Sequence, residues 1–388
     1  MERITKFTIV TPSYNQAAYL EETIKSVIGQ EGPFEIEYFI MDGGSSDSSA
    51  DIIRRYAESV NSGRYPIRCS RVQIYWRSGK DGGQSDAINE GLRRATGDYA
   101  SYINSDDLYF DGAFALVNGT FSQRMEADFV FGDGHVIGKD GALQWEWLSR
   151  PYDHSVMTTY HFLWNDFTNY IMQQATFWRT RVHHRIGLFD ETFHYAMDVE
   201  YWIRAGHKGL SLVHIPEKLG KFRMIEGTKS LSGPTVFWSD WLEIFRRYRG
   251  ANELDSYLAF YYFNLARSLD WDLKAARRVA DEALRRWDKL TEDERAAISR
   301  QCCRAYGLAC YLVALELQRQ GRFELARNYY REGLAHLPGL AIRPAAAFCL
   351  LKQAAGRRGA AVLDRLFDWA VAKYRKNRFD YRYHERTS

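Results

Sequence analysis

Two adjacent carboxylates, Asp106 and Asp107, follow residues 99–104, which alternate between apolar and polar types as a strand does. Neighbouring aspartates at a strand end repel each other unless a cation or a hydroxyl donor shares them. The pair could therefore hold a divalent metal that carries phosphate oxygens. Taken alone, it is more simply explained as an acidic loop that caps the next helix. The choice depends on what the rest of the chain brings to the same place.

Other polar or ring-bearing residues also come directly after predicted strands or begin the next predicted helix: Pro12, Tyr14, Asp42, Asp81 and Asp86. Strand, loop and helix recur over residues 7–104, which predicts an α/β fold with a mostly parallel sheet and helices on both faces. Ligands bind such sheets outside the carboxyl ends of the strands, so these side chains should line one crevice. Asp42 could accept a hydrogen bond from a nucleobase or a ribose, or belong to an ordinary Asp-Gly turn.

The glycine-rich segments do not match the common phosphate loops. Gly43-Gly-Ser45 lacks the Gly-Lys-Ser/Thr ending, and the turn after the first strand lacks the three-glycine fingerprint. A P-loop and a Rossmann dinucleotide site are therefore disfavoured. A sugar-phosphate nucleotidyltransferase would need a glycine-rich triphosphate loop with Arg and Lys near the first strand, and residues 11–15 do not provide one.

A second acidic pair, Asp198 and Glu200, lies in the first turn of a helix predicted to begin at Met197. Acidic residues are common in a first helical turn because of the helix dipole. A carboxylate at a helix start that faces a crevice would equally serve as a general base. Both interpretations stay open at this point.

The composition excludes some classes of protein. The chain has 388 residues, of which 46% are hydrophobic, and a formal net charge of +3. This length is sufficient for two domains, and the balanced charge argues against a nucleic-acid binder. Neither a run of 18 apolar residues nor a signal-peptide core is found, so we expect a soluble, cytoplasmic protein. The five cysteines have no zinc-type spacing and are expected to be reduced.

Strand patterns end near Gly233-Pro234, which predicts a domain of residues 1–232 and an all-helical domain of residues 233–388. Residues 321–338 resemble half of a tetratricopeptide unit, but an array needs about three units. We therefore expect a compact helical appendage that either stabilises the first domain or binds an acceptor or partner. The basic and aromatic tail, residues 373–388, is either a solvated end or a contact with an anionic membrane surface.

Seven segments in this order together resemble the family 2 inverting glycosyltransferases, which have the GT-A fold: residues 8–16, 37–47, 81–89, 97–98, 104–107, 174–179 and 198–204. The likeness spans roughly residues 4–230. It implies transfer of a sugar from a nucleotide diphosphate, expected to be UDP-linked, to a glycan or lipid-linked acceptor hydroxyl. It also implies bacterial surface polysaccharide synthesis as the setting, with peripheral contact at the inner membrane face.

The resemblance implies roles for individual residues. Pro12, Tyr14 and Asp42 would hold the nucleoside, Asp81, Asp86 and Asp106 would lie by the donor, and Asp107 would bind Mn²⁺ or Mg²⁺. Asp198 would be the base, with Glu200 as second choice. Family members often carry a histidine where this chain has Ile225, so Arg223 and Lys229 remain as cations for the phosphates, or as surface charges. The alternative from another class is an inactive sugar-nucleotide-binding scaffold that acts through its helical domain.

Overall fold

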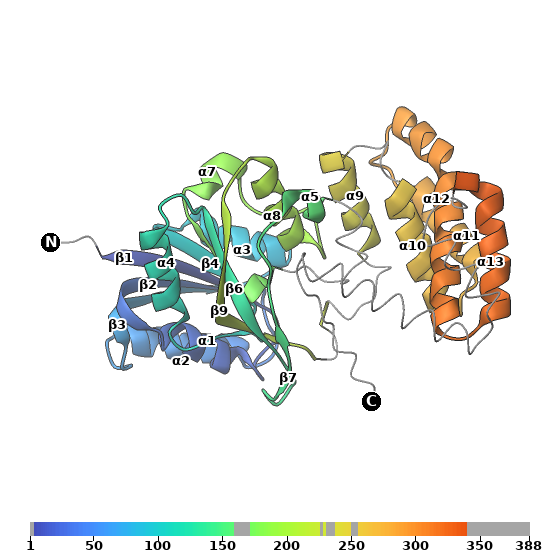
Figure 1. Ribbon diagram of the computed structural model, residues 1–388. Helices are drawn as coiled ribbons and strands as arrows, with labels where there is room; N and C mark the ends of the chain where they lie inside the picture. Colours follow the sequence, from blue (N-terminus) through green and yellow to red (C-terminus); the bar gives the residue numbers. More distant parts are fainter. Residues whose placement is uncertain (1–3, 159–170, 226–227, 230–236, 250–254, 340–388) are drawn as a thin grey trace. The chain divides into compact units, whose positions relative to one another are not determined.

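The computed structural model describes residues 4–158, 171–225, 228–229, 237–249 and 255–339. The chain divides into two compact units, residues 1–249 and 250–388. The first unit contains the sheet and the second is helical (Figure 1). The C-terminal tail, for which membrane contact is an expectation, lies outside the described residues. Within the described residues, no helix is long and apolar enough to cross a membrane.

The first unit is built around one nine-stranded sheet, counted over the described residues. Its strand order is β3-β2-β1-β4-β8-β6-β9-β5, with β7 paired to β6. The strands are β1 Thr5–Ser13, β2 Glu31–Asp42, β3 Arg68–Ser78, β4 Tyr99–Tyr102, β5 Leu108–Tyr109, β6 Phe129–Ile137, β7 Leu143–Trp147, β8 Thr176–Arg179 and β9 Leu212–Arg223.

The four strands from β3 to β4 are parallel, as the strand, loop and helix repeat predicts. Their register aligns the strand ends, since Ser13 pairs with Asp42, and Asp42 pairs with Ser78. Beyond β4 the sheet is mixed: β8 runs antiparallel to both of its neighbours, and β6 and β9 are parallel to each other. The loops after β1, β2, β3 and β4 therefore leave the sheet at one edge.

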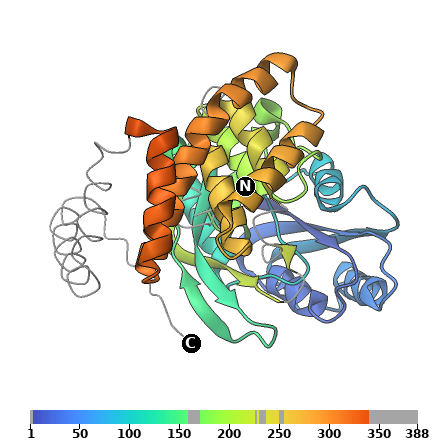
Figure 2. The ribbon, with the colours of Figure 1, turned by 90° about the vertical axis from the view of Figure 1, so that its right-hand side faces the viewer.

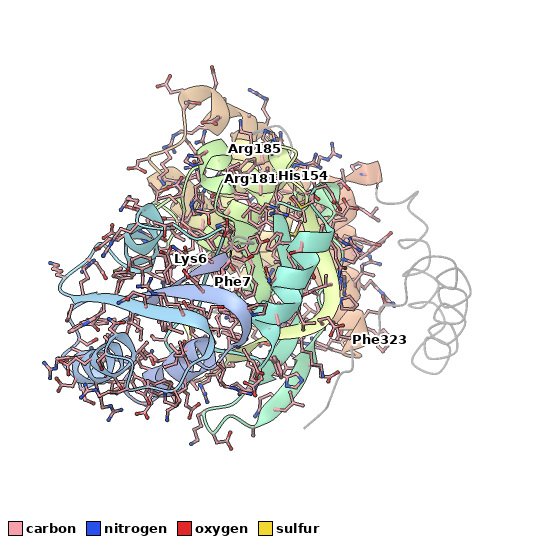
Figure 3. All side chains as sticks on the ribbon, turned by 90° about the vertical axis from the view of Figure 1, so that its left-hand side faces the viewer. Lys6, Phe7, His154, Arg181, Arg185 and Phe323 are labelled. Carbon is pink, nitrogen blue, oxygen red and sulfur yellow. The ribbon has the colours of Figure 1, made fainter. Side chains whose placement is uncertain are left out.

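Helices cover both faces of the sheet. They are α1 Leu20–Ile28, α2 Ser49–Asn61, α3 Gln84–Arg93, α4 Ala113–Gln123, α5 His154–Met157, α7 Val182–Ile186, α8 Met197–His207 and α9 Trp238–Arg249. Phe7 of β1 is labelled in Figure 3, and its ring contacts Phe34 and Phe114 on the face that α1, α2 and α4 cover. On the other face, a Cβ at Gly91 of α3 would lie 2.7 Å from the methyl carbons of Val10, so this close helix contact requires glycine.

Two segments differ from the sequence pattern. Residues 173–179 read as one strand, but Gln173–Ala175 form a 3₁₀ turn and only Thr176–Arg179 are extended. Helix α9 follows the predicted boundary at residue 232, yet it belongs to the first compact unit. Its contacts with the sheet unit, described below, run through polar side chains, and the apolar periodicity of a helix does not reveal such contacts.

The second unit consists of helices α10 Asp255–Ser268, α11 Leu273–Arg286, α12 Glu292–Arg319 and α13 Phe323–His336 among its described residues. Thr291 and Glu294 form a capping box that begins α12. Helices α12 and α13 lie side by side (Figure 2). A Cβ at Gly333 would lie 3.0 Å from the backbone oxygen of Gly307, so small residues permit this close contact. The helical character of the C-terminal region is confirmed.

Candidate active site

Polar loops converge at the carboxyl edge of β1 to β4. We call residues 12–16, 42–47, 79–86 and 104–107 the strand-end cluster. Backbone and side-chain hydrogen bonds join the first two loops: Ser46 N donates to Asn15 Oδ1 over 2.8 Å, and Asn15 N donates to Ser45 Oγ over 2.8 Å. Asn15 has a φ of 53°, a left-handed conformation that Asn tolerates better than most residues. These two hydrogen bonds hold the loops after β1 and β2 in a fixed position relative to each other.

Tyr14 and Asp81 meet at this edge. A Cβ at Gly43 would lie 3.1 Å from Asp81 Oδ2 and 3.4 Å from Tyr14 Cδ2, so the three residues surround one small space. Tyr14 is 63% exposed, which is unusual for an aromatic ring at a strand end. Pro12 is buried beneath the loop. An exposed ring beside a carboxylate can stack on a planar base while the carboxylate accepts from a polar hydrogen.

Asp42 is completely buried and holds its own turn. Its Oδ2 accepts from Gly44 N at 3.2 Å and Ser45 N at 3.0 Å, and from the Ser78 hydroxyl, while Oδ1 accepts from the Ser45 hydroxyl. A carboxylate offers about four acceptor positions, so little capacity remains. The geometry supports a role for Asp42 in shaping the loop, and its expected direct contact with a nucleoside stays a prediction.

Asp81 and Asp86 both stabilise the turn that begins α3. Gly83 N donates to Asp81 Oδ1, and Gly82 N donates to Asp86 Oδ2, each over 2.9 Å. Asp81 Oδ2 takes no part in this turn and faces Gly43. Of the two carboxylates, Asp81 is therefore better placed to meet a ligand at the strand-end cluster.

Asp106 and Asp107 have distinct environments. Asp107 is fully buried, and its carboxylate accepts from Gln174 Nε2 at 2.8 Å, Asn104 Nδ2 at 3.1 Å and Arg223 N at 2.8 Å. Burial, followed by the neighbouring charge of Asp106, raises the pKa of Asp107 well above its usual value. Burial also raises the pKa of Asp106, and the charge of Arg223 partly offsets this.

Arg223 is a cationic side chain beside Asp106 and Asp107, and it is only 1% exposed. Its guanidinium donates to the backbone oxygens of Asp106 at 2.9 Å, Lys139 at 3.1 Å and Gly138 at 3.2 Å, and pairs with Glu22 over 2.6 Å. These contacts occupy the planar fork. In this arrangement Arg223 supports the acidic loop, and its expected contact with the donor stays a prediction.

The acidic pair also bears on the expected metal. No three His, Cys, Asp or Glu side chains come together to hold a metal anywhere in the described ranges. Mg²⁺ is often held by one or two carboxylates plus substrate phosphates and water, and Asp106 and Asp107 provide such an incomplete set. A nearby cation would also stabilise the charged form of these two carboxyls, the buried Asp107 and the partly buried Asp106, whose pKa values are both raised. The residues therefore fit a metal whose coordination a diphosphate completes.

The two base candidates lie in very different surroundings. Glu200 is 1% exposed; it pairs with Arg204 over 2.9 Å and accepts from the Tyr248 hydroxyl over 2.6 Å. Asp198 is partly exposed, and its Oδ1 accepts from Val199 N over 2.8 Å. The buried ion pair makes Glu200 a structural carboxylate of α8, whereas Asp198 is accessible. We call residues 187–200, which lead into and begin α8, the helix-start segment.

Side chains connect the helix-start segment to the strand-end cluster. Lys229 Nζ donates to His194 O at 3.1 Å and to Gln84 Oε1 at 2.8 Å. Gln84 Nε2 donates to Asn104 Oδ1 over 2.7 Å, and Asn104 in turn donates to Asp107. The result is a continuous hydrogen-bonded chain from Lys229 to Asp107.

The buried hydroxyl of Tyr102 lies where the charges of both Asp107 and Asp198 act on it. Burial raises the pKa of its hydroxyl well above the usual value, and the charges of Asp198 and Asp107 raise it further. Burial lowers the pKa of Lys229, while the charges of Asp240 and Asp198 act in the opposite direction. Asp107 and Asp198, which are 91 residues apart in sequence, thus act on one hydroxyl.

Sequence reasoning assigned no role to several residues of this network. Gln84, Asn104 and Gln174 lie inside the recognised segments, so their positions could have suggested a role. Residues 173–179 have the pattern of a strand, but the 3₁₀ turn at Gln173–Ala175 presents the side-chain amide of Gln174 to Asp107. Asp240 has no signal in the sequence, because an acidic residue in a first helical turn is ordinary.

The chain is similar in sequence to known glycosyltransferases. Residues 8–197 match the family described as glycosyl transferase family 2. An uncharacterised glycosyltransferase of Mycobacterium tuberculosis is 30% identical over 203 residues, which are 51% of this chain and 68% of that protein. The minor teichoic acid biosynthesis protein GgaB of Bacillus subtilis is 34% identical over 126 residues, 32% of this chain and 13% of that protein.

Among solved structures, S. aureus TarS 1-349, crystallised in complex with UDP-GlcNAc, matches with a TM-score of 0.51 at 15% identity. The match covers 85% of this chain and 89% of that chain. At this identity the likeness shows the fold alone. The expected GT-A architecture with a helical C-terminal region is thereby confirmed.

Proposed function

Because this chain belongs to glycosyl transferase family 2, we propose that it transfers a sugar from a nucleotide diphosphate to an acceptor hydroxyl with inversion at the anomeric carbon. The observation that carries this proposal is the hydrogen-bonded chain from Asp107 through Asn104, Gln84 and Lys229 to His194, in the segment that leads into Asp198. The charges of Asp107 and Asp198 both act on the Tyr102 hydroxyl, one from the strand-end cluster and one from the start of α8. A displacement reaction needs a stabilised leaving group and a base for the attacking hydroxyl, and these two carboxylates supply both.

We assign the reaction steps as follows. Asp198 accepts the proton of the acceptor hydroxyl, whose oxygen forms the new bond to the anomeric carbon. The bond from that carbon to the diphosphate breaks, and the nucleoside diphosphate leaves with the electron pair. Bound Mn²⁺ or Mg²⁺ would stabilise the charge that builds on the diphosphate, held by Asp107 with Asp106 beside it. We place Lys229, which donates to Gln84 and feels the charge of Asp198, as a cation for the diphosphate.

For the donor, we propose that Tyr14 and Asp81 bind the nucleoside on the loop that Pro12 and Asp42 shape. Asp86 fixes the neighbouring turn. A UDP-linked sugar is the first donor to test, because TarS, which shares the fold, was crystallised with UDP-GlcNAc. A glycan or lipid-linked acceptor of bacterial surface polysaccharide is the first acceptor class to test, because GgaB is a teichoic acid biosynthesis protein.

We propose residues 1–232 as the catalytic domain, with α9 as an extension that packs on it. The helical unit that follows is proposed to bind acceptor or partner, or to stabilise the chain. Cytoplasmic location and membrane contact through residues 373–388 stay predictions. Co-sedimentation with anionic vesicles, with and without these residues, tests the membrane contact, and equal binding by both forms would contradict it.

The decisive experiment for the proposed function uses the purified full chain with a panel of nucleotide sugars. Release of nucleoside diphosphate is measured with Mn²⁺, with Mg²⁺ and with a chelator. We expect one donor to be turned over, with rates that the chelator abolishes. Nucleotide-sugar binding without turnover of any donor, with lipid-linked and soluble glycan acceptors present, would instead favour the inactive scaffold.

A further inference from the structure

Asp240, in the first turn of α9, makes an arrangement that the reaction proposed above does not use. Its Oδ2 accepts from three consecutive backbone N–H groups: His194 at 2.9 Å, Tyr195 at 2.6 Å and Ala196 at 3.0 Å. The residue is 5% exposed. Three converging N–H groups form a concave site that favours an anion, and here a carboxylate from another helix fills it.

This contact lies directly before the helix that carries the proposed base, Asp198. Ala196 is the N-cap of α8 and makes no side-chain cap, so the helix begins without its own capping oxygen. Asp240 satisfies backbone donors in the three residues immediately before the helix. Asp198 is the second residue of α8. The carboxylate of Asp240 thus fixes the backbone from which the proposed base projects.

Other side chains of α9 hold the same segment. Arg247 pairs with Asp190 over 2.6 Å, and its guanidinium lies 4.8 Å from the ring centre of Phe193. Farther along α8, the Tyr248 hydroxyl donates to Glu200. Helix α9 therefore contacts the helix-start segment both before and after Asp198, and Asp240 makes the contact with the residues immediately before α8.

We infer that Asp240 is a positioning residue for the base, acting through the backbone of residues 194–196. This inference rests on the proposed function. A general base must lie within hydrogen-bond reach of the acceptor hydroxyl, and a displacement of about 1 Å can cost on the order of 100-fold in rate. Among the described residues, the hydrogen bonds of Asp240 go to the helix-start segment, and its charge also acts on Lys229. We therefore expect its main effect on the transfer step.

The test compares three full-length variants. Asp240→Ala leaves three N–H groups without their acceptor, and Asp240→Asn keeps an acceptor oxygen without the charge. The matched control is Asp128→Asn. Asp128 is also a buried carboxylate, 7% exposed, and it accepts from a loop N–H, that of Ser211, over 3.2 Å. It precedes β6 at the opposite edge of the sheet, where it pairs with Arg181 and Arg185, both labelled in Figure 3.

We expect Asp240→Ala to lower kcat by about 10- to 100-fold, with KM for the donor and the affinity for nucleoside diphosphate within about twofold of wild type. Asp240→Asn should fall between Asp240→Ala and wild type. Asp128→Asn should lower the melting temperature without lowering kcat. A kcat that falls only in proportion to the folded fraction would overturn the positioning role.

A double-mutant cycle tests whether Asp240 affects the rate through Asp198. If Asp240 acts through Asp198, Asp240→Ala should change the residual rate of the Asp198→Asn enzyme by less than about twofold, because neighbours that act as a unit are not additive. An equal fold-loss in both backgrounds would contradict the inference.

Amide hydrogen exchange keeps the inference separate from the proposed function. Asp240→Ala should speed exchange at residues 194–198, while the amides of β1 and β2 keep wild-type protection. Unchanged exchange at residues 194–198 would overturn the positioning role even in an active enzyme. Faster exchange in a protein that turns over no nucleotide sugar would instead support the contact while the proposed function fails.

Discussion

The strand-end cluster carries Asp107 and the helix-start segment carries Asp198, and these two regions are held in different ways. The strand-end cluster leaves four parallel strands whose register aligns their ends. The helix-start segment has no strand of its own between β8 and α8. It is held by side chains from elsewhere, including Asn89 of α3, which exchanges two hydrogen bonds with the backbone of Phe189 at 2.8 and 3.0 Å.

The difference shows what positions the side chains in each of the two regions. A sheet edge positions its loops through many backbone hydrogen bonds, so the loss of one side chain leaves the geometry largely in place. The helix-start segment depends on a few side chains, chiefly Asn89, Asp240 and Arg247. Substitutions in the first region should therefore act mainly on ligand binding, and substitutions in the second mainly on the rate of transfer.

The largest expected effect is that of Asp198→Asn. The amide cannot take the acceptor proton, so kcat should fall by roughly 10²- to 10⁴-fold, the usual range for a lost general base. Nucleotide affinity should stay near that of wild type, because the proposed donor site is the strand-end cluster and not the helix-start segment. Steady-state kinetics and calorimetry together check this. A variant with wild-type turnover would contradict the assignment of the base.

Asp107→Ala tests the strand-end cluster in the same way. It removes the proposed metal ligand, so the gain in nucleotide affinity on adding Mn²⁺ should disappear, a loss of about 100-fold or more. Calorimetry with and without Mn²⁺ measures this directly. Because Asp107 is buried and hydrogen-bonded, Asp107→Asn serves as the better-folded companion variant. Unchanged Mn²⁺-dependent affinity in both variants would show that the metal is held elsewhere.

Acid should affect stability through His183, which lies in α7, just before the helix-start segment. Burial lowers the pKa of His183 to about 4, and its Nε2 accepts from Trp178 Nε1 over 2.8 Å. The unfolded chain binds a proton near pH 6.5 and the folded chain only near pH 4. Stability should thus decrease as pH falls from 6.5 to 4, by on the order of 3 kcal/mol in total.

Urea unfolding across this pH window measures the effect of His183. His183→Gln should flatten the decrease in the free energy of unfolding. His184→Gln, at the exposed neighbouring position, should change it far less, because burial is the main cause of the lowered pKa of His183 and the charge of His184 the smaller one. An unaltered pH slope in His183→Gln would show that the decrease has another source.

Gln174→Ala should give the smallest of these effects. It removes one of three hydrogen bonds to the buried Asp107 carboxylate, and outer partners of metal-bound groups typically contribute about 10- to 100-fold in affinity. Mn²⁺-dependent nucleotide binding should weaken by that amount, with kcat at saturating donor little changed. Gln173→Ala is the control, because Gln173 donates to Tyr102 O and not to Asp107. Equal losses in both variants would remove the special role of Gln174.

The sequence by itself determined which residues form the strand-end cluster and that they share one edge of the sheet. Alternating strands, short loops and the positions of Asp42, Asp81 and Asp107 follow local patterns, and parallel strands bring their ends to one edge. Asp198 could also be found, because it begins a helix within a recognised segment. The helical character of the C-terminal region followed from its periodicity.

Only the tertiary structure decided which of these side chains are accessible and what holds them. Sequence patterns do not distinguish a buried ion pair such as Glu200 with Arg204 from an accessible carboxylate such as Asp198. They also gave no reason to connect Asp240 with residues 194–196, more than 40 positions earlier. Local propensity acts over a few residues, whereas burial and hydrogen bonds between distant segments are set by how whole elements pack.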